Sequence, residues 1–280
     1  MDAEPPDAMV LPMSTLVAAE SAGDLLREWR QRRRLSQLDL ALDAEVSTRH
    51  LSFVETGRSA PSREMLLRLA ERLDMPLRAR NRLLNAAGFA GVYPERALDS
   101  PDLSAARKAV DLVLGAHRPF PALAVDRGWN LVAANESAQA LMTGVAAELL
   151  ASPINVLRLS LHPKGLAPRI DNLGEWRAHL LNRLQQQIER SGDPELQALR
   201  RELSGYPGAD AVASRHDPLG VVTPLRLRVD WASEPLSMIS TTTVFGTPVD
   251  VTLSELALEC FFPADERTRR ALEQAGSACT

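Results

Sequence analysis

Residues 35–61 decide the fold of the first part of the chain: Leu-Ser-Gln-Leu-Asp-Leu-Ala-Leu-Asp-Ala-Glu-Val-Ser-Thr-Arg-His-Leu-Ser-Phe-Val-Glu-Thr-Gly-Arg-Ser-Ala-Pro. Ser36 and Ser47 are favourable helix N-caps, and Gly57 can adopt the positive φ that ends a helix. The stretch therefore predicts a short helix, a tight turn and a second capped helix. Such a pair forms a helix-turn-helix, whose second helix can enter the major groove of DNA.

The second helix of this pair supplies the candidate base contacts. Its expected outward side chains are Thr48, Arg49, Ser52 and Phe53. Arg49 can donate a bidentate pair to guanine, the two hydroxyls can read either base type, and Phe53 can touch a thymine methyl. Phosphate contacts are expected from Gln37, Thr56 and Arg58. The alternative is a generic helical bundle with solvated charges, but a bundle does not need this capped turn and its Gly57-Arg58 exit.

Amphipathic segments on both sides complete a five-helix, all-α domain over residues 21–88. Residues 1–20 are expected to form a disordered leader, and residues 89–104 a linker broken by Gly91, Pro94 and Pro101. Residues 23–96 hold 14 Arg and 10 acidic residues, whereas the rest holds 18 basic and 26 acidic residues. A basic module on an acidic body indicates that only the first part meets a polyanion.

The second domain, residues 105–268, has α+β character. A hairpin is expected over 121–133, followed by helices over 136–142, 173–190 and 194–203. Strands are expected over 221–229, 236–246 and 249–259, before a C-terminal tail of residues 269–280. A central antiparallel sheet flanked by helices is the natural packing for this order of elements.

Both domains resemble a known family. Leu35-Ser36-Gln37, Glu55-x-Gly57-Arg58 and Pro61-Ser62 resemble the Cro/C1-type (XRE) helix-turn-helix. The stretches 118–135, 155–159, 175–180 and 240–248 are similar to the MmyB-like transcription regulators. The resemblance implies a recognition helix near 47–55, an internal pair between Glu55 and Arg30, and a PAS-like second domain that binds fatty acids. It departs from the family at Glu45, which stands where the turn has a small residue.

A ligand pocket in the second domain can be placed only by position in the chain. The candidate lining residues are Leu123, Trp129, Val156, Leu159, Trp176, Leu180 and Leu184, although their positions favour an ordinary core role for each of them. A carboxylate headgroup would need a cation or hydroxyls, and Arg158, His162, Arg169 and residues 241–243 are available. His162 and His179 can also be read as structural histidines.

Other classes of protein find little support. The chain has no Gly-rich phosphate loop, zinc-protease helix or nucleophile elbow, so an enzyme is not expected. Its two cysteines have no metal-ligand spacing, so neither metal nor cofactor is expected beyond a bound fatty acid as effector. A haem- or flavin-sensing domain, and an antitoxin-like regulator whose second domain mediates dimerisation or protein interactions, stay open.

The sequence thus predicts a cytoplasmic transcription regulator. Its expected partners are double-stranded DNA, a second copy of the chain in a homodimer, and an apolar small molecule. No membrane partner is expected, because no apolar run is long enough to span a bilayer.

Overall fold

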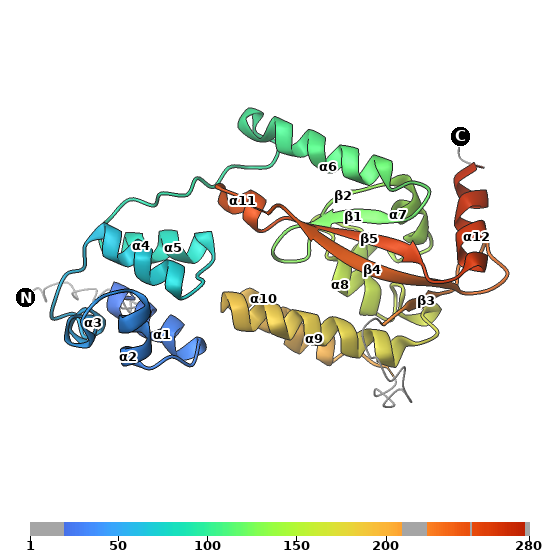
Figure 1. Ribbon diagram of the computed structural model, residues 1–280. Helices are drawn as coiled ribbons and strands as arrows, with labels where there is room; N and C mark the ends of the chain where they lie inside the picture. Colours follow the sequence, from blue (N-terminus) through green and yellow to red (C-terminus); the bar gives the residue numbers. More distant parts are fainter. Residues whose placement is uncertain (1–19, 209–222, 247, 278–280) are drawn as a thin grey trace, which may run out of the picture. The chain divides into compact units, whose positions relative to one another are not determined.

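The computed structural model describes residues 20–208, 223–246 and 248–277 (Figure 1). Its contacts divide the chain into two units: residues 20–75 and 80–91 form the first, and residues 76–79 together with 92 onwards form the second. Each unit is described by itself. Most of the expected leader and the last three residues of the expected tail lie outside the described residues.

The first unit contains four helices and most of a fifth, as the sequence predicts: α1 (Ala22–Arg32), α2 (Gln37–Asp43), α3 (Thr48–Glu55), α4 (Arg63–Arg72) and α5 (Leu77–Ala86). The first four begin at serine N-caps, because the hydroxyls of Ser21, Ser36, Ser47 and Ser62 accept a backbone N–H from the first turn. At α2 the Asp39 carboxylate also accepts from the Ser36 N–H, which forms a capping box. The fully buried side chains that hold these helices together include Leu26, Leu40, Leu51, Leu66 and Leu69.

The helices of the first unit end in the same way. Residues in the left-handed region follow each helix, namely Arg34, Glu45, Gly57, Asp74 and Gly88. At the end of α2, the Glu45 N–H donates to Leu42 O at 3.2 Å and the Val46 N–H donates to Ala41 O at 2.9 Å. This is the Schellman arrangement, which satisfies carbonyls at a helix end. Glu45, with φ 55°, therefore adopts the conformation for which a small turn residue is better suited.

The second unit contains a five-stranded antiparallel sheet with strand order β2-β1-β5-β4-β3. The strands are β1 (Ala122–Val125), β2 (Leu131–Ala134), β3 (Leu225–Leu227), β4 (Leu236–Val244) and β5 (Ala257–Pro263). The helices are α6 (Ser104–Ala116), α7 (Glu136–Leu141), α8 (Val156–Leu161), α9 (Leu173–Ser191), α10 (Pro194–Ser204), α11 (Val251–Ser254) and α12 (Glu266–Ser277). Short 3-10 turns occupy Pro101–Leu103, Ala147–Leu149 and Ala167–Arg169. The unit is therefore α+β, as predicted.

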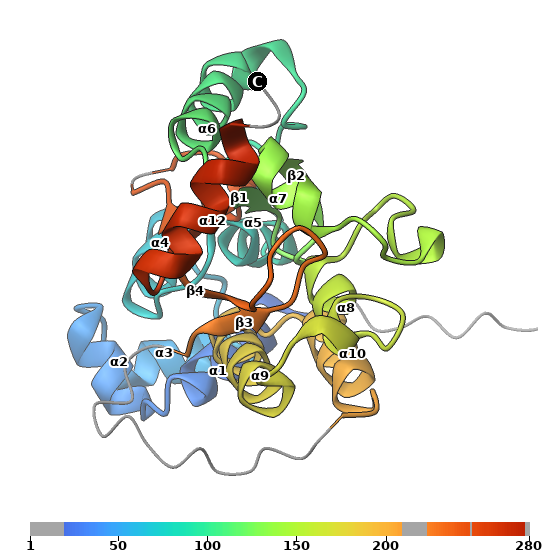
Figure 2. The same ribbon diagram turned by 90° about the vertical axis from the view of Figure 1, so that its right-hand side faces the viewer.

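The two faces of the sheet are covered differently (Figure 1). Ala122 and Ala124 of β1 pack on one face with Val110 and Leu114 of α6. Leu123 and Val125 of β1 point the opposite way, into a larger apolar core shared with α8, α9 and α10. This alternation follows from the two-residue period of a strand. Helix α12 packs against β4 and β5 (Figure 1, Figure 2).

Several sequence-based boundaries need correction. The strand expected over 249–259 begins only at Ala257, because Asp250 caps a short helix by accepting the N–H groups of Thr252 and Leu253. The strand expected over 221–229 is confined to Leu225–Leu227 within the described residues. Helices α6 and α8 were not predicted, and α12 occupies much of the stretch that the sequence assigned to a tail. In the described part of the chain, no helix is long and apolar enough to cross a membrane.

Candidate functional sites: recognition helix and buried cavity

The predicted recognition residues share one surface of α3. Arg49 is exposed, whereas Thr48, Ser52 and Phe53 are half-buried. The Arg49 guanidinium lies 5.3 Å from the centre of the Phe53 ring, one helical turn further along. A cation held over an aromatic ring is restrained in the directions it can point. Phe53 therefore supports Arg49, a role that the sequence analysis did not give it.

The residues expected to contact phosphate are not equally free to do so. Arg58 is exposed, and no ion pair involves it among the described residues. Thr56 is also exposed, but its hydroxyl donates to Ser52 O at 2.8 Å, so that proton is already engaged. Gln37 begins α2, and its Nε2 donates to Glu55 Oε2 at 2.8 Å. The remaining amide N–H of Gln37 can donate to a phosphate from a fixed position.

Glu55 is the buried centre of the helix-turn-helix. It is 2% exposed, and its carboxylate accepts from Arg30 Nε at 2.7 Å and from Arg30 Nη2 at 2.8 Å. The pair that the family resemblance implies is therefore present. Burial works to raise the pKa of Glu55, but the hydrogen bonds from Arg30 and Gln37 and the nearby positive charges outweigh it and lower the pKa. Glu55 thus stays charged and holds α1, α2 and α3 together.

A cavity of about 90 Å³ lies in the second unit, between one face of the sheet and helices α7, α8 and α9. Its wall is almost entirely apolar. Six of the candidate pocket residues line it: Leu123, Trp129, Val156, Leu159, Trp176 and Leu180. Leu184 is fully buried in the adjoining core instead. The other lining residues are Pro121, Ala138, Leu141, Met142, Leu157, Ser160, Leu166, Arg183, Leu225, Leu227, Ser240, Glu259 and Phe261.

The cations proposed for a headgroup lie outside this cavity. Arg158 forms a bidentate pair with Glu202, with both N–O distances at 2.8 Å. The His162 ring packs edge-on against Tyr206, with ring centres 5.0 Å apart. The Arg169 guanidinium donates to Thr143 O at 2.9 Å. None of the three is among the residues that line the cavity, and each makes a contact elsewhere.

Sequence reasoning missed the charged pair that does line the cavity. Arg183 Nη2 lies 2.7 Å from Glu259 Oε1, and Arg183 Nη1 lies 3.1 Å from Glu259 Oε2. Two signals were available. Arg183 follows Trp176 by seven residues, which places both on one face of α9, and Glu259 interrupts an apolar strand. Neither signal indicates that Arg183 and Glu259 pair with each other, because they lie 76 residues apart in the sequence.

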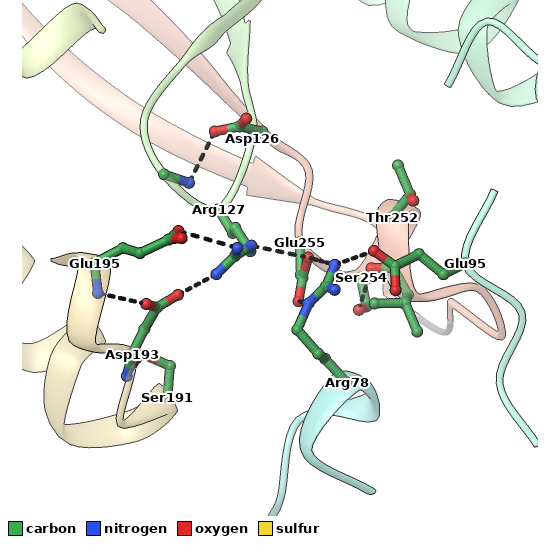
Figure 3. A network of polar contacts seen from close by, with 12 residues as sticks. Arg78, Glu95, Asp126, Arg127, Ser191, Asp193, Glu195, Thr252, Ser254 and Glu255 are labelled. Carbon is green, nitrogen blue, oxygen red and sulfur yellow. Dashed lines mark hydrogen bonds and ion pairs between the residues drawn. The ribbon is translucent and has the colours of Figure 1, made fainter. Parts of the chain in front are cut away.

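A hydrogen-bonded path leads from the cavity wall to a charged cluster. Trp129 Nε1 donates to Gln187 Oε1 at 2.7 Å, and Gln187 Nε2 donates to Arg127 O at 2.8 Å. Figure 3 shows the Arg127 side chain among three acids of the same unit, with Asp193 in direct contact, Glu195 at 3.1 Å and Glu255 at 3.9 Å. The β1–β2 turn is therefore anchored to the start of α10 and to the segment before β5.

Comparison with protein families identifies both parts of the chain. Residues 106–275 match the family described as the MmyB-like transcription regulator ligand binding domain, and residues 26–79 match a helix-turn-helix family. A search of curated proteins gave no match. Among solved structures, an RNA-binding light-oxygen-voltage receptor aligns at 14% identity with a TM-score of 0.24, over 93% of this chain and 64% of that chain. A TM-score this low does not establish a common fold.

The family match explains the two sites described above. The surface around Arg49 lies in the matched helix-turn-helix, and the apolar cavity lies in the matched ligand-binding domain. Both families are those of transcription regulators rather than enzymes. The chain therefore belongs to the MmyB-like transcription regulators, in which a DNA-binding helix-turn-helix precedes a domain that binds a small-molecule effector.

Proposed function

We propose that the effector is an apolar molecule with an acyl chain, of the fatty-acid type or an uncharged derivative of it, and that it occupies the cavity beneath the sheet. The observation that carries this proposal is the wall of the cavity, where leucines and two tryptophans surround a space of about 90 Å³. An apolar group that moves from water into such surroundings lowers the free energy of the system.

The size of the cavity makes ligand binding a conformational event. Pockets for drug-sized ligands usually enclose about 300–1,000 Å³, several times the volume present here. An acyl chain must therefore push lining side chains apart, and Met142 is the most adaptable of them because it is unbranched. A ligand that favours the expanded arrangement shifts the population towards it, up to its differential affinity for the two arrangements.

At the DNA, the proposed reader is a homodimer. Two copies of α3 about 34 Å apart would occupy successive turns of the major groove and recognise a near-palindromic site. Arg49, Thr48, Ser52 and Phe53 would face base edges, while Gln37, Thr56 and Arg58 would face the backbone. The effector then changes DNA affinity by changing the dimer that presents these helices.

Native mass spectrometry of the purified full-length protein tests the ligand proposal, followed by denaturing extraction of whatever is released. One lipid per chain that changes affinity for an operator fragment is the expected result. The Ala138→Leu variant fills the cavity and should abolish both lipid binding and the response, while Ala140→Leu on the exposed face of α7 should abolish neither. A lipid that persists in the Ala138→Leu protein would place the ligand elsewhere.

A further inference from the structure

One part of the cavity wall is formed by a buried ion pair, Arg183 and Glu259. Glu259 lies on the cavity side of β5, opposite Leu123 of β1 and Thr242 of β4. Its carboxylate accepts from Arg183 and from the Thr242 hydroxyl, at 2.7 Å and 2.8 Å for the same oxygen. The Glu259 side chain is 5% exposed. A charge this deeply buried persists because its partner neutralises it.

The charges facing the cavity cancel. Arg183 and Glu259 are the charged side chains among its lining residues, one of each sign. His179 packs on the Trp176 ring, where burial and the charge of Arg183 lower its pKa, so it adds no positive charge near neutral pH. A carboxylate that entered the cavity would gain Arg183 only by lying beside Glu259. Two carboxylates that share one site repel each other, and one of them is then driven to take up a proton.

Hydrogen-bonding capacity nevertheless remains for an uncharged group. Among the described residues, the contacts of Arg183 engage three of its five N–H groups. The Ser160 hydroxyl accepts from Trp176 Nε1 at 3.0 Å and retains its own proton to donate. The hydroxyl of Ser240, another lining residue, makes no side-chain hydrogen bond within the described part of the chain. The wall of the cavity therefore offers donors and an acceptor, but no net charge.

We infer that the effector enters with an uncharged polar group, such as an amide, an alcohol or an ester, and that Glu259 rejects the ionised carboxylate of a free fatty acid. This inference rests on the proposed function, because it assumes that the cavity is the effector site. Glu259 is then a specificity-determining residue. It neutralises Arg183, so that no free positive charge is available to bind the carboxylate of an acid. The acyl chain proposed above fits the same apolar wall with a different headgroup.

The test compares three eight-carbon probes, octanamide, 1-octanol and octanoate, on the full-length protein at neutral pH. Their binding is followed by calorimetry and by the fluorescence of Trp129 and Trp176, which line the cavity. Octanamide and 1-octanol are expected to bind at least about tenfold more tightly than octanoate, the factor that corresponds to one unit of pKa. Octanoate binding as tightly as octanamide overturns the inference but leaves the cavity as the effector site.

A variant separates charge from shape. Glu259→Gln keeps the size of the side chain and leaves Arg183 with a net positive charge, so octanoate should gain about tenfold while octanamide changes little. Glu202→Gln is the matched control, because it breaks an Arg–Glu pair of similar geometry outside the cavity. If Glu259→Gln does not fold, the comparison of the three probes on the wild-type protein still decides the inference. Absence of binding by all three probes, together with no effect of Ala138→Leu on effector response, overturns both the cavity site and this inference.

Discussion

Removal of the Glu55 charge should destabilise the first unit strongly. The substitution Glu55→Gln keeps the shape of the side chain but replaces one acceptor oxygen by an NH2 group that can only donate. That group would face the donors of Arg30 or Gln37, which now bind the two carboxylate oxygens at 2.7–2.8 Å. Arg30, whose side chain is 12% exposed, would be left without a counter-charge.

The expected loss is about 3–5 kcal/mol, the usual cost when one partner of a buried ion pair is removed. Domains of this size have unfolding free energies of about 5–15 kcal/mol, so the variant should be partly unfolded at moderate urea concentrations. The matched control is Glu28→Gln. Glu28 also pairs with an arginine, Arg32, but is 44% exposed, and such surface pairs contribute at most about 1 kcal/mol.

Hydrogen exchange followed by mass spectrometry, carried out at increasing urea concentrations, measures the stability of α1–α3 separately from that of the second unit. The refuting result is a Glu55→Gln protein whose α1–α3 peptides are protected as well as those of Glu28→Gln. The pH dependence gives a second check. The folded pKa of Glu55 lies below its unfolded value, so its stabilisation is present above the unfolded pKa and is lost as pH falls through the folded one. The difference between wild type and Glu55→Gln should shrink in acid.

Three further outcomes are expected. Arg49→Ala should cost about 1–3 kcal/mol at one operator base pair, measured by fluorescence anisotropy; an equal loss on random DNA would make Arg49 a phosphate contact. Glu45→Gly should raise the unfolding free energy of the first unit by about 0.5–1 kcal/mol, because Glu45 has φ 55°, a conformation that is strained for a residue with a Cβ but not for glycine. An unchanged urea midpoint would contradict this expectation. Gln187→Leu should destabilise the second unit by about 1–3 kcal/mol, since the Trp129 indole N–H loses its acceptor. Gln185→Leu should be nearly neutral, because the Gln185 amide bonds Glu189 in a solvent-exposed contact; equal effects of the two variants would exclude this reason.

Local signals made the first unit predictable. The serine caps, Gly57 and the apolar spacing all act within a few residues, so the helix-turn-helix follows from sequence. The apolar side of α9 was equally visible, and Trp176 and Leu180 do line the cavity. Their role in ligand binding stays a prediction, as do the proposed DNA contacts.

The features that sequence reasoning missed depend on contacts between distant segments. Arg183 and Glu259 reach each other only after β5 has paired with β4 in the observed register. The prediction of a strand from residue 249 was wrong, because the Asp250 cap favours a helical turn over an extended backbone. Helix α12 is rich in charged residues and buries little beyond Thr268 and Leu272, so its composition resembles that of a solvated tail.

The internal pairing of arginines in the first unit affects how the protein searches a chromosome. Affinity for random DNA comes from cations that neutralise phosphates and release counterions. Arg27, Arg30, Arg32, Arg33 and Arg68 each have a carboxylate within 4.0 Å, so much of their charge is already compensated. We therefore expect the affinity for random DNA to fall only slowly as the salt concentration rises. We also expect a large fraction of the protein to be free of DNA. Occupancy of an operator would then depend mainly on the few side chains that reach its bases.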